Sequence, residues 1–336
     1  MIEEAIGILK EKKDLPAYLM RSVMERILQG SFDTEAIAKF LLLLEEKGVT
    51  VEELTQAAAI MRSYVEKLDV WERDLLDTCG TGGDGLSTFN ISTISALVVT
   101  GAGIKVAKHG NRSVSSRCGS ADLLEALGVN INMSKETVKK CLAEVGIAFL
   151  FAPNWHPAMR HVMPARRQLA RKTIFNILGP LVNPCQVKFQ LVGVYDKRWL
   201  LPLAEVFRNL GSQRVLVVHG ADGLDEVTLT DRTFMVELDR GRIIEYEVTP
   251  EEFGFSRVSL KDLQAADLAE NIRITKEVLN GAKGSYREVV ILNSACAIYA
   301  AGKVSSIKEG LKLAEESLDS GRALEKLNQL VACSQQ

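Results

Sequence analysis

Residues 77–90 read DTCGTGGDGLSTFN, and they place four glycines beside hydroxyl side chains and two carboxylates. The stretch follows a predicted strand at 74–77 and precedes a predicted helix that begins near Asn90. Because glycines leave successive backbone N–H groups exposed, such a loop before a helix N-terminus is a typical binding site for phosphate. The two common nucleotide-binding glycine motifs are both absent. Taken alone, the stretch is equally compatible with a turn that only connects two elements.

Short apolar runs alternate with amphipathic helices from about residue 74 onward. Further strands are predicted at KVA (105–107), IAFLFA (147–152), KFQLVGV (188–194), RVLVVHG (214–220) and TFMVEL (233–238). Helices are predicted at 197–211 and across most of 257–332. This alternation predicts an α/β fold with a central, mainly parallel sheet flanked by helices.

The first 70 residues read as successive helices. Apolar residues recur at the helical period in two sets, which are Ile37, Phe40, Leu41 and Leu44, and Leu54, Ala58, Met61, Val65 and Leu68. A capping box at 50–53 precedes the second set. We expect a small helical domain at 1–72 and a large α/β domain at 73–336, with the proline-punctuated segment 156–185 returning to the helical domain.

The composition favours a globular protein with more than one domain. The chain has 336 residues, 47% of them hydrophobic, and 41 basic against 43 acidic residues give a formal charge of -2. This balance predicts no nucleic-acid or membrane partner. Six scattered cysteines without paired spacing predict reduced thiols and a cytoplasmic location. No apolar run reaches about 18 residues, so the sequence predicts neither export nor a membrane span.

Three further segments carry candidate chemistry. Residues 108–120, KHGNRSVSSRCGS, place basic, amide and hydroxyl side chains after a predicted strand, a pattern that suits a highly charged anion. Residues 219–229, HGADGLDEVTL, carry the adjacent carboxylates Asp225 and Glu226, which are candidate magnesium ligands beside a phosphate site. The helical segment 160–171 carries Arg160, Arg166, Arg167 and Arg171, one of which could bind a carboxylate.

Seven motifs occur in consistent order along nearly the whole chain: GTGGD (80–84), NIST (90–93), KHGNRSVSS (108–116), GSADLLEALG (119–128), HPAMR (156–160), RKTIFNILGPLVNP (171–184) and VVHGADGLDE (217–226). Together they resemble the anthranilate phosphoribosyltransferases, a family of the tryptophan pathway. The resemblance implies a helical domain joined by a hinge to an α/β domain, in the fold shared with pyrimidine nucleoside phosphorylases. It also implies a homodimer formed through the small helical domains.

The family's site residues carry over to matching positions of this sequence. The resemblance places phosphoribosyl pyrophosphate at Gly80, Gly83, Asp84, Thr88, Asn90, Ile91, Ser92, Thr93, Lys108, His109, Gly110, Asn111, Arg112, Ser113, Val114, Ser115, Ser116 and Ser120. It places anthranilate at Gly80, Asn111 and Arg166, and two Mg²⁺ ions per active site at Ser92, Asp225 and Glu226.

The implied reaction is displacement of pyrophosphate from ribose C1 by the anthranilate amine. The resemblance implies no dedicated catalytic acid or base, and His109 alone is expected to be a structural residue. Two alternatives remain open at this point: a pyrimidine nucleoside phosphorylase of the same fold, and a nucleic-acid-binding relative without transferase activity. The first would cleave nucleosides with free phosphate, and the second would require a basic groove.

Overall fold

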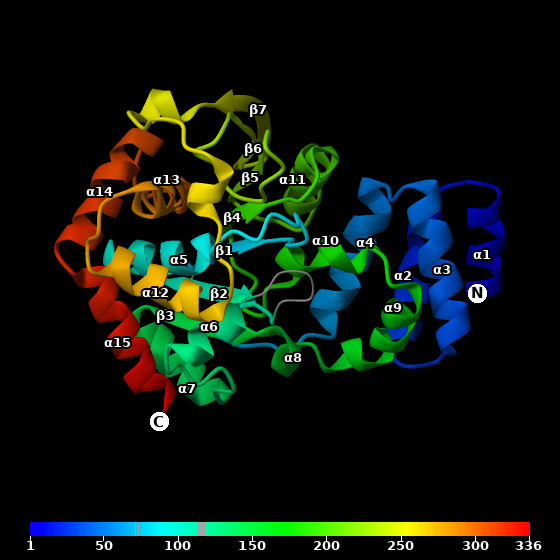
Figure 1. Ribbon diagram of the computed structural model, residues 1–336. Helices are drawn as coiled ribbons and strands as arrows, with labels where there is room; N and C mark the ends of the chain where they lie inside the picture. The colour runs from blue at the N-terminus through cyan, green and yellow to red at the C-terminus, as the bar shows by residue number, and fades with distance from the viewer. Residues whose placement is uncertain (71, 73, 113–117) are drawn as a thin grey trace.

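The computed structural model describes residues 1–70, 72, 74–112 and 118–336. It divides into a helical unit at the N-terminus and a larger α/β unit that contains both the sheet and the C-terminus (Figure 1). This arrangement confirms the predicted fold class.

The α/β unit is built on one seven-stranded sheet in the order β3-β2-β1-β4-β5-β6-β7. Its strands are β1 (Leu76–Gly80), β2 (Val106–Gly110), β3 (Ile147–Phe151), β4 (Phe189–Gly193), β5 (Arg214–Gly220), β6 (Thr233–Asp239) and β7 (Arg242–Val248). The first five strands of this order are parallel, and β6 and β7 are antiparallel to their neighbours. The sheet is therefore mainly parallel, as expected.

The two faces of the sheet belong to two different hydrophobic cores. Alternate residues of β5 point to opposite faces, so Leu216 and Val218 join one core while Val215 and Val217 join the other. The helices of the α/β unit are α5 (Ile91–Gly101), α6 (Ser120–Ala126), α7 (Lys135–Lys140), α8 (Ala152–Trp155), α11 (Leu200–Asn209), α12 (Leu268–Leu279), α13 (Ser285–Ala300), α14 (Ile307–Asp319) and α15 (Arg322–Ser334). Helices α5, α13 and α15 contribute to the first core and α11 to the second.

The helical unit consists of α1 (Ile2–Lys10), α2 (Ala17–Leu28), α3 (Thr34–Lys47) and α4 (Val51–Ser63). The predicted capping box is present, because Thr50 and Glu53 exchange backbone N–H contacts at the start of α4. The returning segment adds α9 (Met163–Leu169) and α10 (Phe175–Leu178). Its residues Val162 and Phe175 share a core with α1 to α4, with α11 and with one face of the sheet. The helical unit is thus packed directly against the α/β unit.

Several sequence predictions need correction. Strand β1 begins at Leu76 and ends at Gly80 instead of covering 74–77, because its partner β4 pairs with it as far as Gly193. Strand β2 extends to Gly110, so Lys108 and His109 are strand residues and not loop residues. Helix α4 ends at Ser63, and Val65 and Leu68 pack in the sheet core instead of the helical core.

Strand β7 was not predicted. It lies at the edge of the sheet, and its residues Arg242, Glu245 and Glu247 are exposed. Because these charged residues interrupt any apolar run, the sequence of β7 is similar to that of a surface loop. Of the four arginines expected on one helix, only Arg166 and Arg167 lie on α9; Arg160 lies in a 3-10 helix, and Arg171 follows the end of α9.

No helix in the part of the chain that the structure describes is long and apolar enough to cross a membrane.

Candidate active site

The predicted site segments meet at one edge of the sheet. Segment 81–90 follows β1, and segment 221–229 follows β5. Both strands run parallel to β2 and β4, so their carboxyl ends lie at the same edge, which is where ligands of open α/β sheets bind. The N–H of Gly82 donates to a carboxylate oxygen of Asp225 at 2.8 Å. The glycine-rich and acidic segments are therefore in direct contact.

The glycine-rich segment presents bare backbone donors. Gly82, Gly83 and Gly85 have φ angles of +64°, +80° and +76°, which only glycine adopts at low cost. Among the described residues, no acceptor pairs with the N–H groups of Gly83, Asp84 or Gly85. Successive N–H groups in this conformation form a concave anion site. The geometry fits a phosphate group.

Two glycines permit the acidic segment to approach the strand ends. A Cβ atom on Gly80 would lie 2.5 Å from Oδ2 of Asp225, and a Cβ atom on Gly193 would overlap the Asp225 carbonyl oxygen. Gly80 and Gly193 are paired across β1 and β4. Side chains at either position would push Asp225 away from the loop. Asn293 on α13 holds the other side of the turn through the backbone of Val227, at 3.0 and 2.8 Å.

Asp225 and Glu226 bring two carboxyl groups together close to Asp84. Burial raises the pKa of both carboxyl groups, and the neighbouring carboxylates add to the effect: Asp84 acts on Asp225, and Asp225 acts on Glu226. No group of three or more His, Cys, Asp or Glu residues is arranged to hold a metal within the ranges that the structure covers. A pair of carboxylates fits Mg²⁺, which binds proteins through one or two carboxylates and keeps positions for water and phosphate oxygens.

Lys108 and Ser92 lie next to this pair. Nζ of Lys108 donates to the carbonyl of Thr78 at 2.5 Å and to Oγ of Ser92 at 3.3 Å. The Lys108 ammonium and the backbone N–H of Ser92 partly offset the raised pKa of Glu226. Burial lowers the pKa of Lys108, while the nearby carboxylates oppose that shift. Buried Lys108 and the half-buried residues Ser92 and Glu226 thus form one polar cluster.

Several other residues predicted to bind phosphoribosyl pyrophosphate lie at or just before the start of α5. Asn90 precedes the helix, and its side chain contacts Cys118. The hydroxyl of Thr93 is buried without a hydrogen-bond partner in the described part of the chain. Thr88 forms an isolated bridge with Gln264, and Ile91 is buried in the sheet core.

The segment after β2 is only partly described. Ser113, Val114, Ser115 and Ser116 lie outside the described residues. Oγ of Ser120 donates to the carbonyl of Asn111 at 3.3 Å, and a Cβ on Gly110 would overlap Ser120. Arg112 is bound to α6 through Asp122 and Glu125 at 2.8 and 2.7 Å. Its guanidinium is therefore not directed at the Asp225 and Glu226 pair.

His109 belongs to a buried histidine pair. Its Nε2 lies 3.2 Å from Nε2 of His156, and both side chains are buried. Burial lowers the pKa of His109 to about 3, with a further contribution from His156, and lowers the pKa of His156 to about 4. Burial therefore favours the neutral form of both imidazoles near neutral pH.

The histidine pair predicts acid sensitivity. The folded pKa values lie below the unfolded value of about 6.5, so the stabilisation is complete above pH 6.5 and is lost as the pH falls toward 4. Each imidazole contributes a loss of about 1.4 kcal/mol per pH unit in this window. His156→Gln should reduce the slope of unfolding free energy against pH, measured by urea denaturation between pH 7 and 4. Equal slopes for the two proteins would contradict the assignment.

Arg166 is a half-buried cation without a counter-ion. Its guanidinium lies 5.9 Å from the ring centroid of Phe175, and burial lowers its pKa. It makes no ion pair with any residue in the described ranges. A guanidinium in this state can bind a carboxylate with two parallel hydrogen bonds.

Some residues that contact the site segments but lie far from them in the sequence were not predicted. Gly193 ends an ordinary apolar strand, and Asn293 lies in the middle of a buried helix, so neither carries a local signal. Asn183 binds the buried Asp77 carboxylate at 2.8 Å. Lys172 donates to the carbonyl of Gly83 at 2.8 Å. Each of these residues could be identified only by knowing which distant segments of the chain lie side by side.

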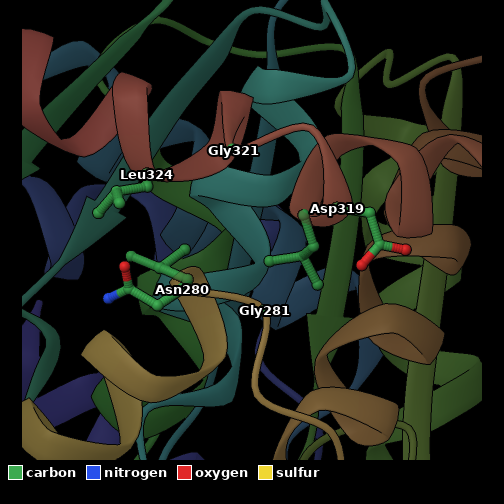
Figure 2. A pocket seen from close by; sticks show the side chains of 7 residues that line it. Asn280, Gly281, Asp319, Gly321 and Leu324 are labelled. Carbon is green, nitrogen blue, oxygen red and sulfur yellow. The ribbon is translucent and has the colours of Figure 1, made fainter.

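A cavity lies away from these residues, among the C-terminal helices of the α/β unit. Its volume is about 340 Å³. Figure 2 shows its lining residues between the end of α12 and the junction of α14 and α15. Its one carboxylate, Asp319, is bound to Arg287 at 2.8 Å. The remaining lining residues are apolar or carry no charge, so this cavity presents no catalytic group.

Comparisons with known proteins agree with this geometry. Residues 3–65 match the glycosyl transferase family helical bundle domain, and residues 72–324 match the glycosyl transferase family a/b domain. The chain therefore belongs to the glycosyl transferases that combine these two domains.

The relatives define the family more closely. An anthranilate phosphoribosyltransferase of Persephonella marina is 48% identical over 98% of both chains. The structure of the Thermus thermophilus enzyme of that name has a TM-score of 0.93 at 41% identity, covering 99% of both chains. The Saccharomyces cerevisiae enzyme in complex with PRPP and Mg has a TM-score of 0.91 at 29% identity, covering 99% of this chain and 98% of the other. This chain is a member of the anthranilate phosphoribosyltransferase family.

Proposed function

We propose that the chain transfers the 5-phosphoribosyl group of phosphoribosyl pyrophosphate to the amine of anthranilate and releases pyrophosphate. The observation that carries this proposal is the contact between the glycine-rich loop and Asp225. That contact combines free backbone donors for a diphosphate with carboxylates for Mg²⁺ at a single sheet edge. The chain's family membership supports the same reaction.

The donor side of the site carries most of the catalytic task. Pyrophosphate leaves with negative charge while ribose C1 approaches an oxocarbenium cation. The free N–H groups of Gly83, Asp84 and Gly85 and the ammonium of Lys108 are fixed donors near the departing charge. Each fixed donor of this kind is worth about 3 kcal/mol in comparable sites. When bound at Ser92, Asp225 and Glu226, Mg²⁺ neutralises part of the same charge.

The acceptor side requires orientation and no proton removal before attack. The anthranilate nitrogen has a free electron pair, so its attack on C1 does not need a base. Arg166 would bind the carboxylate and Asn111 the amine end, with Gly80 beside them. Holding the nitrogen in line with C1 contributes about 7 kcal/mol or more.

The details of assembly extend the proposal. Two Mg²⁺ ions per site are supported by the different neighbours of the two carboxylates, since Asp225 faces Asp84 and Glu226 faces Ser92 and Lys108. The proposal includes a homodimer formed through the helical unit, as the family resemblance implies. No disulfide joins the cysteines of the described residues to one another, which supports a reducing compartment such as the cytoplasm. The end of one matched segment at residue 65 and the start of the other at residue 72 support the proposed domain boundary.

Arg166→Ala should weaken anthranilate binding selectively. Loss of a charged, bidentate hydrogen-bond partner corresponds to about 2 kcal/mol, or roughly 30-fold in the KM for anthranilate. The KM for phosphoribosyl pyrophosphate should change little. Steady-state kinetics with each substrate varied in turn would measure both constants. Arg167→Ala is a matched control, because Arg167 is the exposed neighbour on the same helix. An equal rise in both KM values would refute the role of Arg166.

The proposed reaction has a direct assay. Anthranilate fluorescence should fall after phosphoribosyl pyrophosphate and Mg²⁺ are added to the purified protein. Phosphorolysis of thymidine or uridine tests the nucleoside phosphorylase alternative in the same preparation. Nucleoside cleavage without loss of anthranilate fluorescence would replace the proposed function with that alternative. A salt-dependent DNA mobility shift in a protein inactive in both assays would favour the nucleic-acid-binding relative.

A further inference from the structure

Lys172 links the returning segment to the glycine-rich loop. It follows the end of α9, where Ala170 has a φ of +47°, and precedes α10. Its Nζ donates to the carbonyl oxygen of Gly83 at 2.8 Å, although the two residues are 89 positions apart. The same Nζ lies 3.3 Å from the ring centroid of Tyr195, immediately beyond β4. Two independent contacts therefore fix the position of this ammonium group.

The ammonium lies near the acidic residues without pairing with them. Asp196, Asp84 and Asp225 all favour the charged form of Lys172, whereas burial opposes it. No carboxylate in the described ranges comes within ion-pair distance of Nζ. Lys172 thus contributes positive charge at the site while the carboxylate oxygens stay available to a metal ion.

The contact with Gly83 determines where a neighbouring donor points. The peptide unit is planar and trans, so its C=O and N–H groups point in opposite directions. When Lys172 holds the carbonyl of Gly83, the N–H of Asp84 is directed away from Lys172. That N–H is one of the three unpaired donors of the loop. The loop itself depends on glycine, because Gly83 has a φ of +80° and its missing Cβ would lie 3.4 Å from Cε of Lys172.

We propose that Lys172 is a positioning residue for the diphosphate of the sugar donor. Its ammonium, held on the Gly83 carbonyl and the Tyr195 ring, orients the Gly83–Asp84 peptide so that its N–H faces the diphosphate. Its positive charge also offsets the nearby carboxylates Asp84 and Asp225 without forming an ion pair with either of them. The inference rests on the proposed function for the identity of the ligand as phosphoribosyl pyrophosphate. Lys172, which lies outside the glycine-rich loop, would determine the orientation of the Gly83–Asp84 peptide.

The test compares donor binding with metal binding in Lys172→Met and Lys172→Arg. Lys172→Met should weaken binding of phosphoribosyl pyrophosphate with Mg²⁺ about tenfold by calorimetry, as expected for one charge-assisted hydrogen bond. It should leave the KM for anthranilate unchanged. Binding of Mg²⁺ alone should be equal or tighter, since a neighbouring positive charge is removed. Lys172→Arg should restore most of the donor affinity, because guanidinium also donates to carbonyls and stacks on aromatic rings.

Lys188→Met is the matched control. Nζ of Lys188 also donates to a glycine carbonyl, that of Gly211 at 3.1 Å, but it lies beyond the opposite end of β4. This variant should bind donor and metal as the wild type does. If Lys172→Met does not fold, Lys172→Gln provides an uncharged hydrogen-bond donor at the same position. This variant should show an intermediate loss of affinity for phosphoribosyl pyrophosphate.

The outcomes separate this inference from the proposed function. Unchanged donor affinity in Lys172→Met, or in Lys172→Gln where the Met variant does not fold, would overturn the inference. Parallel weakening of donor and bare Mg²⁺ binding would also overturn it, because that result indicates general loss of structure. A wild type that binds the donor but does not consume anthranilate would refute the proposed function alone, since the calorimetric comparison needs no turnover.

Discussion

Asp225→Asn combined with Glu226→Gln should abolish magnesium-dependent turnover, with a fall in kcat/KM of at least about a thousandfold. The substitutions keep the size of both side chains and remove the negative charges that would hold Mg²⁺ at the departing pyrophosphate. A loss of about 4 kcal/mol of transition-state stabilisation corresponds to this factor. The measurement is anthranilate fluorescence loss at saturating donor over a range of Mg²⁺ concentrations.

The double variant has an internal control in its stability. Burial raises the pKa of both carboxyl groups, so their ionised forms destabilise the metal-free fold near neutral pH. The variant should therefore be at least as resistant to urea as the wild type in the absence of metal. An inactive but less stable variant would indicate misfolding, and normal magnesium-dependent turnover would remove both residues from the metal site.

Gly193→Ala should eliminate most activity although Gly193 was not predicted as a site residue. The added Cβ would overlap the carbonyl oxygen of Asp225. Either the acidic turn, which is segment 221–229, or the end of β4 must therefore move. Overpacking of this kind costs about 1–3 kcal/mol of stability. Movement of Asp225 would also break its 2.8 Å bond from the Gly82 N–H. We expect a fall of at least about a hundredfold in kcat/KM, together with a lower urea midpoint.

Gly7→Ala is the control for this substitution. Gly7 lies in α1, and a Cβ there would meet no atom within 4 Å, so the variant should retain full activity. Wild-type activity in Gly193→Ala would mean that the acidic turn tolerates displacement. That result would contradict the tight approach of Asp225 to the strand ends.

The sequence predicted the fold class because its signals are local. Apolar runs such as RVLVVHG alternate with helices at a spacing typical of parallel sheets, and β5 forms at the residues expected. Strand β7 escaped prediction because an edge strand needs no continuous apolar run, and its charged residues face solvent. The ends of β1 and β2 were misplaced because pairing with neighbouring strands, and not local composition, determines how far each strand extends.

The candidate site was predictable where its residues are consecutive. The glycine loop and the Asp225 and Glu226 pair each form a short motif, and the structure brings them together. Lys172, Gly193 and Asn293 were not predictable, since each acts by contact with a segment far away in the sequence. Arg112 pairs with α6 in this structure, and its contact with the phosphoribosyl donor stays a prediction. Side-chain direction depends on tertiary contacts that a motif does not contain.

The central claim is that the glycine-rich loop and the acidic turn form one site for a sugar diphosphate and a divalent cation. The most direct measurement is the anomalous difference map of crystals soaked with phosphoribosyl pyrophosphate and Mn²⁺ as a substitute for Mg²⁺. The account predicts a peak within bonding distance of Asp225 or Glu226, with the diphosphate against the N–H groups of Gly83–Gly85. A diphosphate bound elsewhere, with no anomalous peak at these carboxylates, would contradict it.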